Sequence, residues 1–173
     1  MRDKTFWKER NMYSKKNPIS NYQRLQPSSF NTLGLLFYYA DKDDSILEIG
    51  CNVGRHLKVL RQRGYKKSEG VEINKNCKKY RLIDEIAFED VDHFLKKNKK
   101  FDIVFTHGNV IQFLSLKTFN RIFEITNKYI ILSNEDKIPF FKRYIACFDP
   151  KFKKINSYRI EGFNTLVYGT DKD

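Results

Sequence analysis

The sequence has few of the residues that cross-link small proteins. It contains only three cysteines, Cys51, Cys77 and Cys147, and none of them forms a C-x-x-C pair. An odd number without that spacing predicts neither a disulfide framework nor a zinc site. With 173 residues, the chain is long enough to bury a sizeable core without such supports. We therefore expect reduced cysteines and no metal site.

Long apolar runs are also missing. No stretch approaches the roughly 18 apolar residues of a membrane-spanning helix, and the start Met1-Arg2-Asp3-Lys4 does not lead into the apolar core of a signal peptide. These absences predict a protein without a membrane span, located in the cytoplasm. The chain is nevertheless 40% hydrophobic, with 15 Phe and 10 Tyr, which is too apolar for a disordered protein.

Acidic residues are in the minority, with 21 Asp and Glu against 33 Lys and Arg and a formal net charge of +12. This excess keeps nucleic acid open as a partner, because clustered basic side chains gain affinity by displacing phosphate counterions. The lysines are scattered, however, in pairs such as Lys66-Lys67 and Lys78-Lys79. A solvated charged surface explains that distribution, so we rank nucleic acid as the less favoured partner.

One stretch combines a strand, a tight turn and the start of a helix. Ser45–Ile49 is apolar apart from Glu48, and apolar residues return from Leu57 onward at helical spacing. Gly50 and Gly54 flank the turn, where a missing Cβ permits unusual backbone angles and close approach of a ligand. The helix start offers unpaired backbone N–H groups. This pattern predicts a loop that binds a nucleotide.

A second acidic position strengthens that prediction. Glu72 ends another short apolar run, 22 residues after Gly50, about where nucleotide-binding α/β folds place a carboxylate on the ribose hydroxyls. A carboxylate can accept hydrogen bonds from both vicinal hydroxyls. An isolated glutamate is more often an exposed surface acid, but the combination with the loop favours the ribose role.

The segment Glu48-x-Gly50-x-Asn52-x-Gly54 is similar to the E/D-x-G-x-G-x-G loop of Rossmann-like (class I) S-adenosylmethionine (SAM) methyltransferases, with Asn52 at the middle glycine. Asparagine tolerates left-handed backbone angles better than most residues. The dinucleotide pattern G-x-G-x-x-G would require glycine at both Asn52 and Arg55, so NAD is disfavoured.

The resemblance implies SAM as cofactor and a set of contacts at the strand ends. A third strand at Ile86–Phe88 would be followed by Asp90 beside the adenine amino group and Val91 against the ring, with Glu89 as the alternative acid. The cofactor-binding residues that it implies are Glu48, Gly50, Cys51, Asn52, Gly54, Glu72, Ile73, Asp90 and Val91.

His107 is the candidate catalytic residue. It follows the apolar run Phe101–Phe105, where the resemblance places the methyl acceptor, and imidazole titrates near neutrality, as a general base requires. The alternative is that His107 only lines the pocket. The segment Thr106–Asn109 lacks the D/N-P-P-Y/F sequence of many methyltransferases that act on base amino groups, which disfavours a nucleic-acid acceptor.

The order of the apolar segments predicts the fold class. Strands and helices alternate from Asp44 onward, and two β-rich runs, Lys153–Ile160 and Phe163–Thr170, close the chain as an antiparallel hairpin. We predict an α/β, three-layer Rossmann-like methyltransferase sheet that is mostly parallel. Besides the helix after the glycine loop, helices are expected near residues 5–13, 30–37, 76–84, 92–97, 114–125 and 138–148.

The chain is predicted to hold an N-terminal cap or lid, residues 1–29, and one methyltransferase-like domain, residues 30–173. Ser28 and Ser29 are expected to cap the first domain helix, and Trp7, Tyr13 and Tyr22 are candidate lid residues. The chain has no insertion large enough for a substrate domain. We therefore expect a small-molecule or sugar- or lipid-linked acceptor, with a nucleic-acid methyltransferase or a non-catalytic SAM-binding protein as alternatives.

Overall fold

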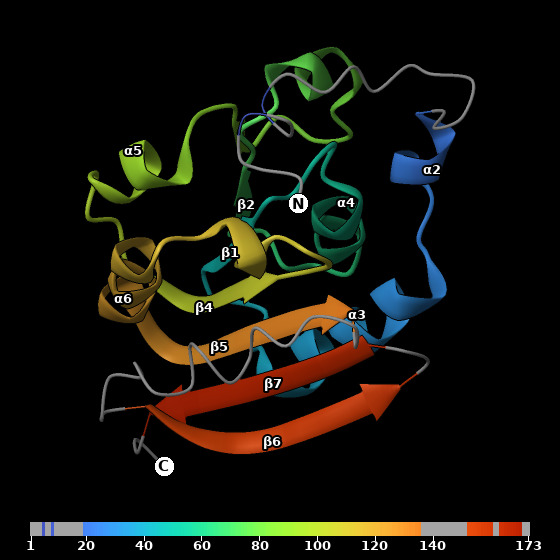
Figure 1. The fold of residues 1–173 in the computed structure, drawn as a ribbon. Coiled ribbons are helices and arrows are strands. Elements are labelled where there is room, and N and C mark those ends of the chain that lie inside the picture. The colour runs from blue at the N-terminus through green and yellow to red at the C-terminus, as the bar shows by residue number, and fades with distance from the viewer. Residues whose placement is uncertain (1–4, 6–7, 9–18, 136–151, 161–162, 171–173) are drawn as a thin grey trace.

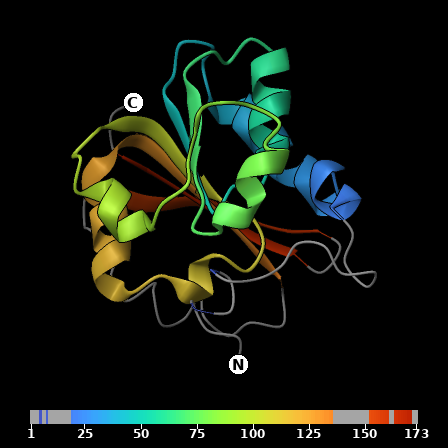
Figure 2. The same ribbon diagram turned by 90° about the horizontal axis from the view of Figure 1, so that it is seen from above.

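A computed structural model describes residues 5, 8, 19–135, 152–160 and 163–170 of the chain. These residues form a seven-stranded sheet in the order β3-β2-β1-β4-β5-β7-β6, with helices on both faces (Figures 1 and 2). The strands are β1 (Ile46–Ile49), β2 (Ser68–Val71), β3 (Ile86–Ala87), β4 (Phe101–Thr106), β5 (Thr126–Glu135), β6 (Phe152–Ile160) and β7 (Phe163–Thr170).

The helical segments divide between the two faces. The α-helices are α2 (Ser20–Gln23), α3 (Pro27–Tyr39), α4 (Arg55–Gln62), α5 (Val91–Leu95) and α6 (Leu116–Ile125), and the 3-10 segments are η1 (Lys75–Tyr80) and η2 (Ile111–Phe113). One apolar core joins α5 and α6 to the sheet, and another joins α3 and α4 to the opposite face. Three layers result, as predicted.

Side-chain alternation along β1 decides which residues meet each layer. Leu47 and Ile49 belong to the core beneath α5 and α6, whereas Ile46 belongs to the core beneath α3 and α4. Alternation therefore turns Glu48 toward α3 and α4. An ionisable residue is thus placed within a mostly apolar layer.

The parallel register aligns the ends of three strands. Ile49 at the end of β1 lies opposite Val71 of β2 and Thr106 of β4. The segments that begin at Gly50, Glu72 and His107 consequently leave the sheet at one edge. In open α/β sheets, ligands bind outside the carboxyl ends of the strands, where the strand order reverses.

The predicted C-terminal hairpin is confirmed. β6 and β7 pair antiparallel, and β7 also pairs antiparallel with β5, while the other pairings are parallel. The predicted fold class is therefore confirmed. Within the described parts of the chain, no helix is both long and apolar enough to cross a membrane.

Two helix predictions need correction. The helix expected from residue 30 starts at Pro27, because Gln26 is its N-cap and the Ser29 hydroxyl accepts the Gln26 N–H at 3.3 Å. The predicted boundary between residues 29 and 30 thus falls inside α3. The segment expected as an α-helix at 76–84 is the 3-10 helix η1, since Asn74 accepts the Asn76 N–H at 3.0 Å and tightens the turn. The helix expected at 138–148, and most of the one at 5–13, lie outside the described residues.

Candidate functional site

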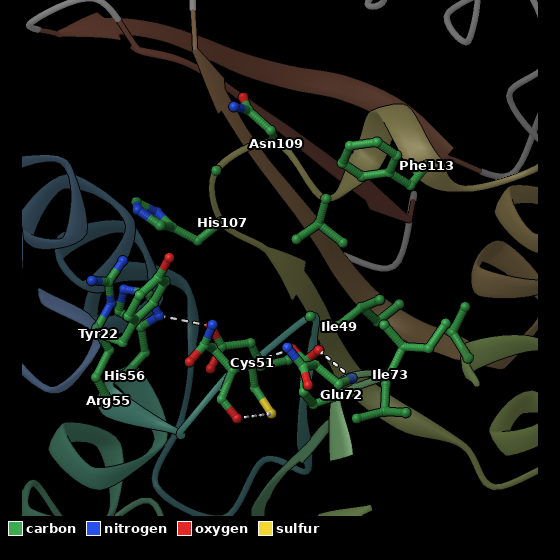
Figure 3. Close-up of a pocket in the computed structure, with 18 of the residues that line it drawn as sticks. Tyr22, Ile49, Cys51, Arg55, His56, Glu72, Ile73, His107, Asn109 and Phe113 are labelled. Carbon is green, nitrogen blue, oxygen red and sulfur yellow. Dashed lines mark hydrogen bonds and ion pairs between the residues drawn. The ribbon is translucent and has the colours of Figure 1, made fainter. Parts of the chain in front are cut away.

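A cavity of about 340 Å³ opens at the aligned strand ends. Its lining combines the loop after β1, the ends of β2 and β4, the start of α5, the η2 region and residues from α2 and α3 (Figure 3). The side chains of Glu72 and Ile73 lie toward one end, and those of Tyr22, Arg55 and His56 gather at the other (Figure 3).

The loop after β1 depends on left-handed backbone angles. Gly50 has φ 74°, Asn52 has φ 55° and Gly54 has φ 81°, so the expected tolerance of asparagine at the middle position is confirmed. A Cβ on Gly50 would lie 2.5 Å from Cγ2 of Val110, and one on Gly54 would lie 2.8 Å from Cδ1 of Ile86. Backbone angle and space both favour glycine at Gly50, whereas at Gly54 the backbone angle is the main requirement, because Cδ1 of Ile86 is the movable end of its side chain.

Glu72 is held against the glycine loop. One carboxylate oxygen accepts the Asn52 N–H at 2.8 Å and the other accepts the Asn74 N–H at 2.8 Å, and the residue is 7% exposed. Burial raises the pKa of Glu72, and the hydrogen bonds from the two backbone N–H groups oppose that rise. Each oxygen keeps further acceptor capacity. The carboxylate of Glu72 therefore suits a ligand that presents two neighbouring hydroxyl groups.

Glu48 forms a buried pair with His56 from the first turn of α4. Oε1 of Glu48 lies 2.6 Å from Nδ1 of His56. The other two polar atoms, Oε2 of Glu48 and Nε2 of His56, have no hydrogen-bond partner. Burial raises the pKa of Glu48 to about 8 and lowers that of His56 to about 3. Both residues line the cavity, so two polar atoms without hydrogen-bond partners lie at the end of the site that Tyr22 and Arg55 also line.

His107 packs between α4 and α3. Its ring centroid is 4.7 Å from that of His56, its Nδ1 lies 2.9 Å from Oγ1 of Thr32, and its Nε2 lies 3.3 Å from Oγ of Ser28. Burial, followed by the charges of His56 and Arg55, lowers the pKa of His107 to about 2. His107 is therefore a neutral imidazole whose two nitrogens face hydroxyl groups. Its role as a general base stays a prediction.

The adenine end differs in detail from the expectation. Ile73 and Val91 line the cavity, as the resemblance implies, but Asp90 is absent from the lining residues. Asp90 is the N-cap of α5 and accepts the Asp92 N–H at 2.9 Å. The alternative acid, Glu89, does line the cavity, and hydrogen bonds from His93 and Lys97 hold its carboxylate.

The structure brings most of the predicted residues together. Gly54 shapes the turn from behind the cavity, while Tyr22 lines it; Trp7 and Tyr13 lie outside the described residues. The prediction missed Arg55 and His56, which follow the glycine loop directly. Their position after that loop was the available signal. The predicted cofactor residues that line the cavity are Glu48, Gly50, Cys51, Asn52, Glu72, Ile73 and Val91.

Comparison with known families identifies the class. The model of a methyltransferase domain matches residues 22–127, which is more than half of the chain. The chain therefore belongs to this methyltransferase family, and the predicted resemblance is confirmed. No curated protein sequence matches the chain.

Solved structures with the same fold have different recorded substrates. A putative SAM-dependent methyltransferase from Streptococcus mutans superposes with a TM-score of 0.68 at 12% identity, over 84% of this chain and 50% of that one. This chain thus spans half the length of that relative. Ribosomal protein L11 methylase from Lactobacillus delbrueckii subsp. bulgaricus gives 0.67 at 13% identity, over 85% and 80% of the two chains. Magnesium protoporphyrin IX methyltransferase from Synechocystis PCC 6803, with bound SAM, gives 0.65 at 14% identity, over 97% and 92%.

Proposed function

We propose that this protein transfers a methyl group from SAM to a small-molecule or sugar- or lipid-linked acceptor. The observation that carries the cofactor assignment is the position of Glu72. Its buried carboxylate is fixed by the N–H groups of Asn52 and Asn74, one of which belongs to the glycine loop itself. The carboxylate that would accept hydrogen bonds from the ribose hydroxyls and the loop that permits close backbone approach therefore form one connected unit.

We assign the parts of the cofactor along that unit. Glu72 receives the ribose hydroxyls, the backbone from Gly50 to Asn52 borders the methionine part, and Ile73 and Val91 flank the adenine. These residues line one continuous cavity. Gly54 acts by shaping the turn, and Asp90 acts by capping α5 so that Val91 keeps its place.

Little covalent chemistry is required of the protein, because SAM, when bound, supplies a methyl group already activated by its sulfonium. The residues of the chain must align the acceptor and exclude water, and such positioning contributes up to about 7–11 kcal/mol of barrier reduction. His107, held by Ser28 and Thr32, is the polar side chain that we place beside the acceptor. Because these two hydroxyls occupy both ring nitrogens, the neutral ring acts as a fixed wall beside the acceptor.

The acceptor side favours a compact ligand. We place it where Val110, Phe113 and Leu114 give the cavity an aromatic and aliphatic surface and where His107 supplies a polar side chain. Such a lining can cover an apolar body and orient a single polar group. The recorded substrates of the two named relatives, a ribosomal protein and a porphyrin, differ in kind, so we infer the acceptor class from the cavity lining instead.

The test has two steps. Calorimetry with S-adenosylhomocysteine (SAH) should show binding, and methyl-labelled SAM should then label a component of a cell extract separated into small molecules, lipids, protein and RNA. Label in the small-molecule or lipid fraction supports the proposal. Label confined to RNA or protein would overturn the acceptor class, and SAH binding without label in any fraction would favour a non-catalytic SAM-binding protein.

A further inference from the structure

Arg55 presents a partly buried charge to the cavity. It occupies the first position of α4, and its side chain lies with those of Tyr22 and His56 at one end of the site (Figure 3). Its Nη1 donates to the backbone carbonyls of Arg24 at 3.2 Å and Asn21 at 3.4 Å. Across the described residues, no carboxylate forms an ion pair with Arg55, and no hydrogen bond uses its Nε or Nη2.

The nearby acid does not neutralise this charge. Glu48 interacts electrostatically with Arg55 but forms its contact with His56 instead. With the pKa of Glu48 raised to about 8 and that of His56 lowered to about 3, both side chains are neutral at neutral pH, so the pair has no net charge. In the tautomer that we assign, protonated Oε1 of Glu48 donates to Nδ1 of His56, and the ring hydrogen lies on Nε2.

Two side chains at this end of the cavity therefore keep N–H groups without an acceptor. The Nε2 of His56 is buried and unpaired, with the residue 2% exposed, and the guanidinium of Arg55 has unused N–H groups. A buried unsatisfied donor costs about 1–3 kcal/mol, and a desolvated charge without a counter-charge is also unfavourable. The first backbone N–H groups of α4 add positive potential of the same sign. One anionic ligand group would accept hydrogen bonds from His56 and Arg55 and would also interact favourably with the positive start of α4.

We propose that Arg55, together with the Nε2–H of His56, forms a carboxylate-binding subsite at the Tyr22 end of the cavity. The planar guanidinium matches the two oxygens of a carboxylate, or of a phosphate, better than an ammonium does. The anion has two potential sources: the methionine carboxylate of the cofactor, which rests on the proposed function, and an anionic group of the acceptor. In both cases an anionic oxygen pair accepts hydrogen bonds from the guanidinium of Arg55 and the Nε2–H of His56.

The experiment compares Arg55→Gln with wild type by calorimetry. SAH carries the carboxylate, whereas 5′-methylthioadenosine keeps the adenine, ribose and thioether but lacks the amino acid. Arg24→Gln is the matched control, because its exposed side chain lies nearby but does not line the cavity. Arg55→Lys tests whether the flat guanidinium is needed in addition to the charge.

If the anion belongs to the cofactor, Arg55→Gln should lose roughly 10- to 100-fold in SAH affinity. Its affinity for 5′-methylthioadenosine should stay unchanged, which also shows that the variant is folded. Arg55→Lys should lie between, and Arg24→Gln should match wild type. An equal loss for both ligands would overturn the proposal, because the variant would then have disturbed the whole pocket.

If the anion belongs to the acceptor, SAH affinity should be unchanged and inorganic phosphate should reveal the subsite. The guanidinium Nε–H signal that disappears in Arg55→Gln should shift on phosphate titration of the SAH-saturated protein, and Arg24→Gln should retain that shift. Unchanged SAH affinity, together with no shift of this signal on phosphate titration, would overturn the proposed subsite. If the wild-type protein binds no SAH, the cofactor assignment is refuted. Phosphate titration of the ligand-free protein, followed by the same Nε–H signal, then tests the subsite separately.

Discussion

Nδ1 of His56 lies 2.6 Å from Oε1 of Glu48, and both side chains are 2% exposed. An acid and an imidazole are thus buried together between β1 and α4, within a layer that is mostly apolar. Removing one partner of such a buried pair leaves the other uncompensated. The pair therefore fixes both the protonation and the position of two cavity residues.

Glu48→Gln should change how the stability of the protein depends on pH. The folded-state pKa of Glu48, about 8, lies above its unfolded value of 4.5, so the stability it contributes is fully present below pH 4.5 and lost as pH rises through 8. Between pH 6.5 and 8, wild type should therefore lose up to about 2 kcal/mol relative to the variant. The contribution of His56, with its lowered pKa of about 3, is complete above pH 6.5 and does not enter this window. Urea titrations at several pH values give the difference, and a pH-independent difference would contradict a protonated Glu48.

Glu72→Ala should weaken SAH binding because the pocket loses the acceptor for the ribose hydroxyls. Each charge-assisted hydrogen bond contributes on the order of 1.5–3 kcal/mol, so a loss of at least 10-fold is expected in calorimetry. Glu69→Ala is a suitable control, since Glu69 lies on β2, the strand that ends just before Glu72, and pairs with Lys99 outside the cavity. Unchanged SAH affinity in a folded Glu72→Ala protein would remove Glu72 from the site.

Gly50→Ala should abolish SAH binding. The new Cβ would meet Val110 at 2.5 Å and would also force an L-residue to adopt φ 74°. The double variant Gly50→Ala, Val110→Ala relieves the contact but keeps the backbone strain, so it should recover only part of the affinity. Full recovery would show that space alone demands glycine, and calorimetry distinguishes these results.

Thr32→Val should destabilise the protein by about 1–3 kcal/mol, because Nδ1 of His107 would lose its partner at 2.9 Å inside the fold. Thr32→Ser keeps the hydroxyl and should lose much less. Urea denaturation of the three proteins measures both effects. Equal stability of the Val and Ser variants would show that the hydroxyl does not hold His107.

Nucleic-acid binding, if it occurs, should be weak and should disappear with added salt. The net charge of +12 supports non-specific attraction, and purely electrostatic binding loses affinity steeply as salt rises. Fluorescence anisotropy with RNA and DNA at 50 and 200 mM salt provides the measurement. Tight, sequence-dependent binding at the higher salt would reverse the ranking of acceptor classes.

Three features were predictable from the sequence alone: the strand, glycine loop and helix around Gly50, the acid at Glu72 and the closing hairpin. These features follow from local rules, since backbone angles at Gly50 and Gly54 restrict the residue type and apolar periodicity distinguishes strands from helices. The spacing of Glu72 from the loop was also readable, because one helix and one turn separate two adjacent parallel strands.

The contacts of the buried polar side chains at the site, by contrast, were not predictable from the sequence. Glu48 meets His56, and His107 meets Thr32, because α4 and α3 pack on the same face of the sheet. Such contacts depend on how separate elements dock, and no short-range pattern encodes that docking. The unpaired charge of Arg55 became visible for the same reason.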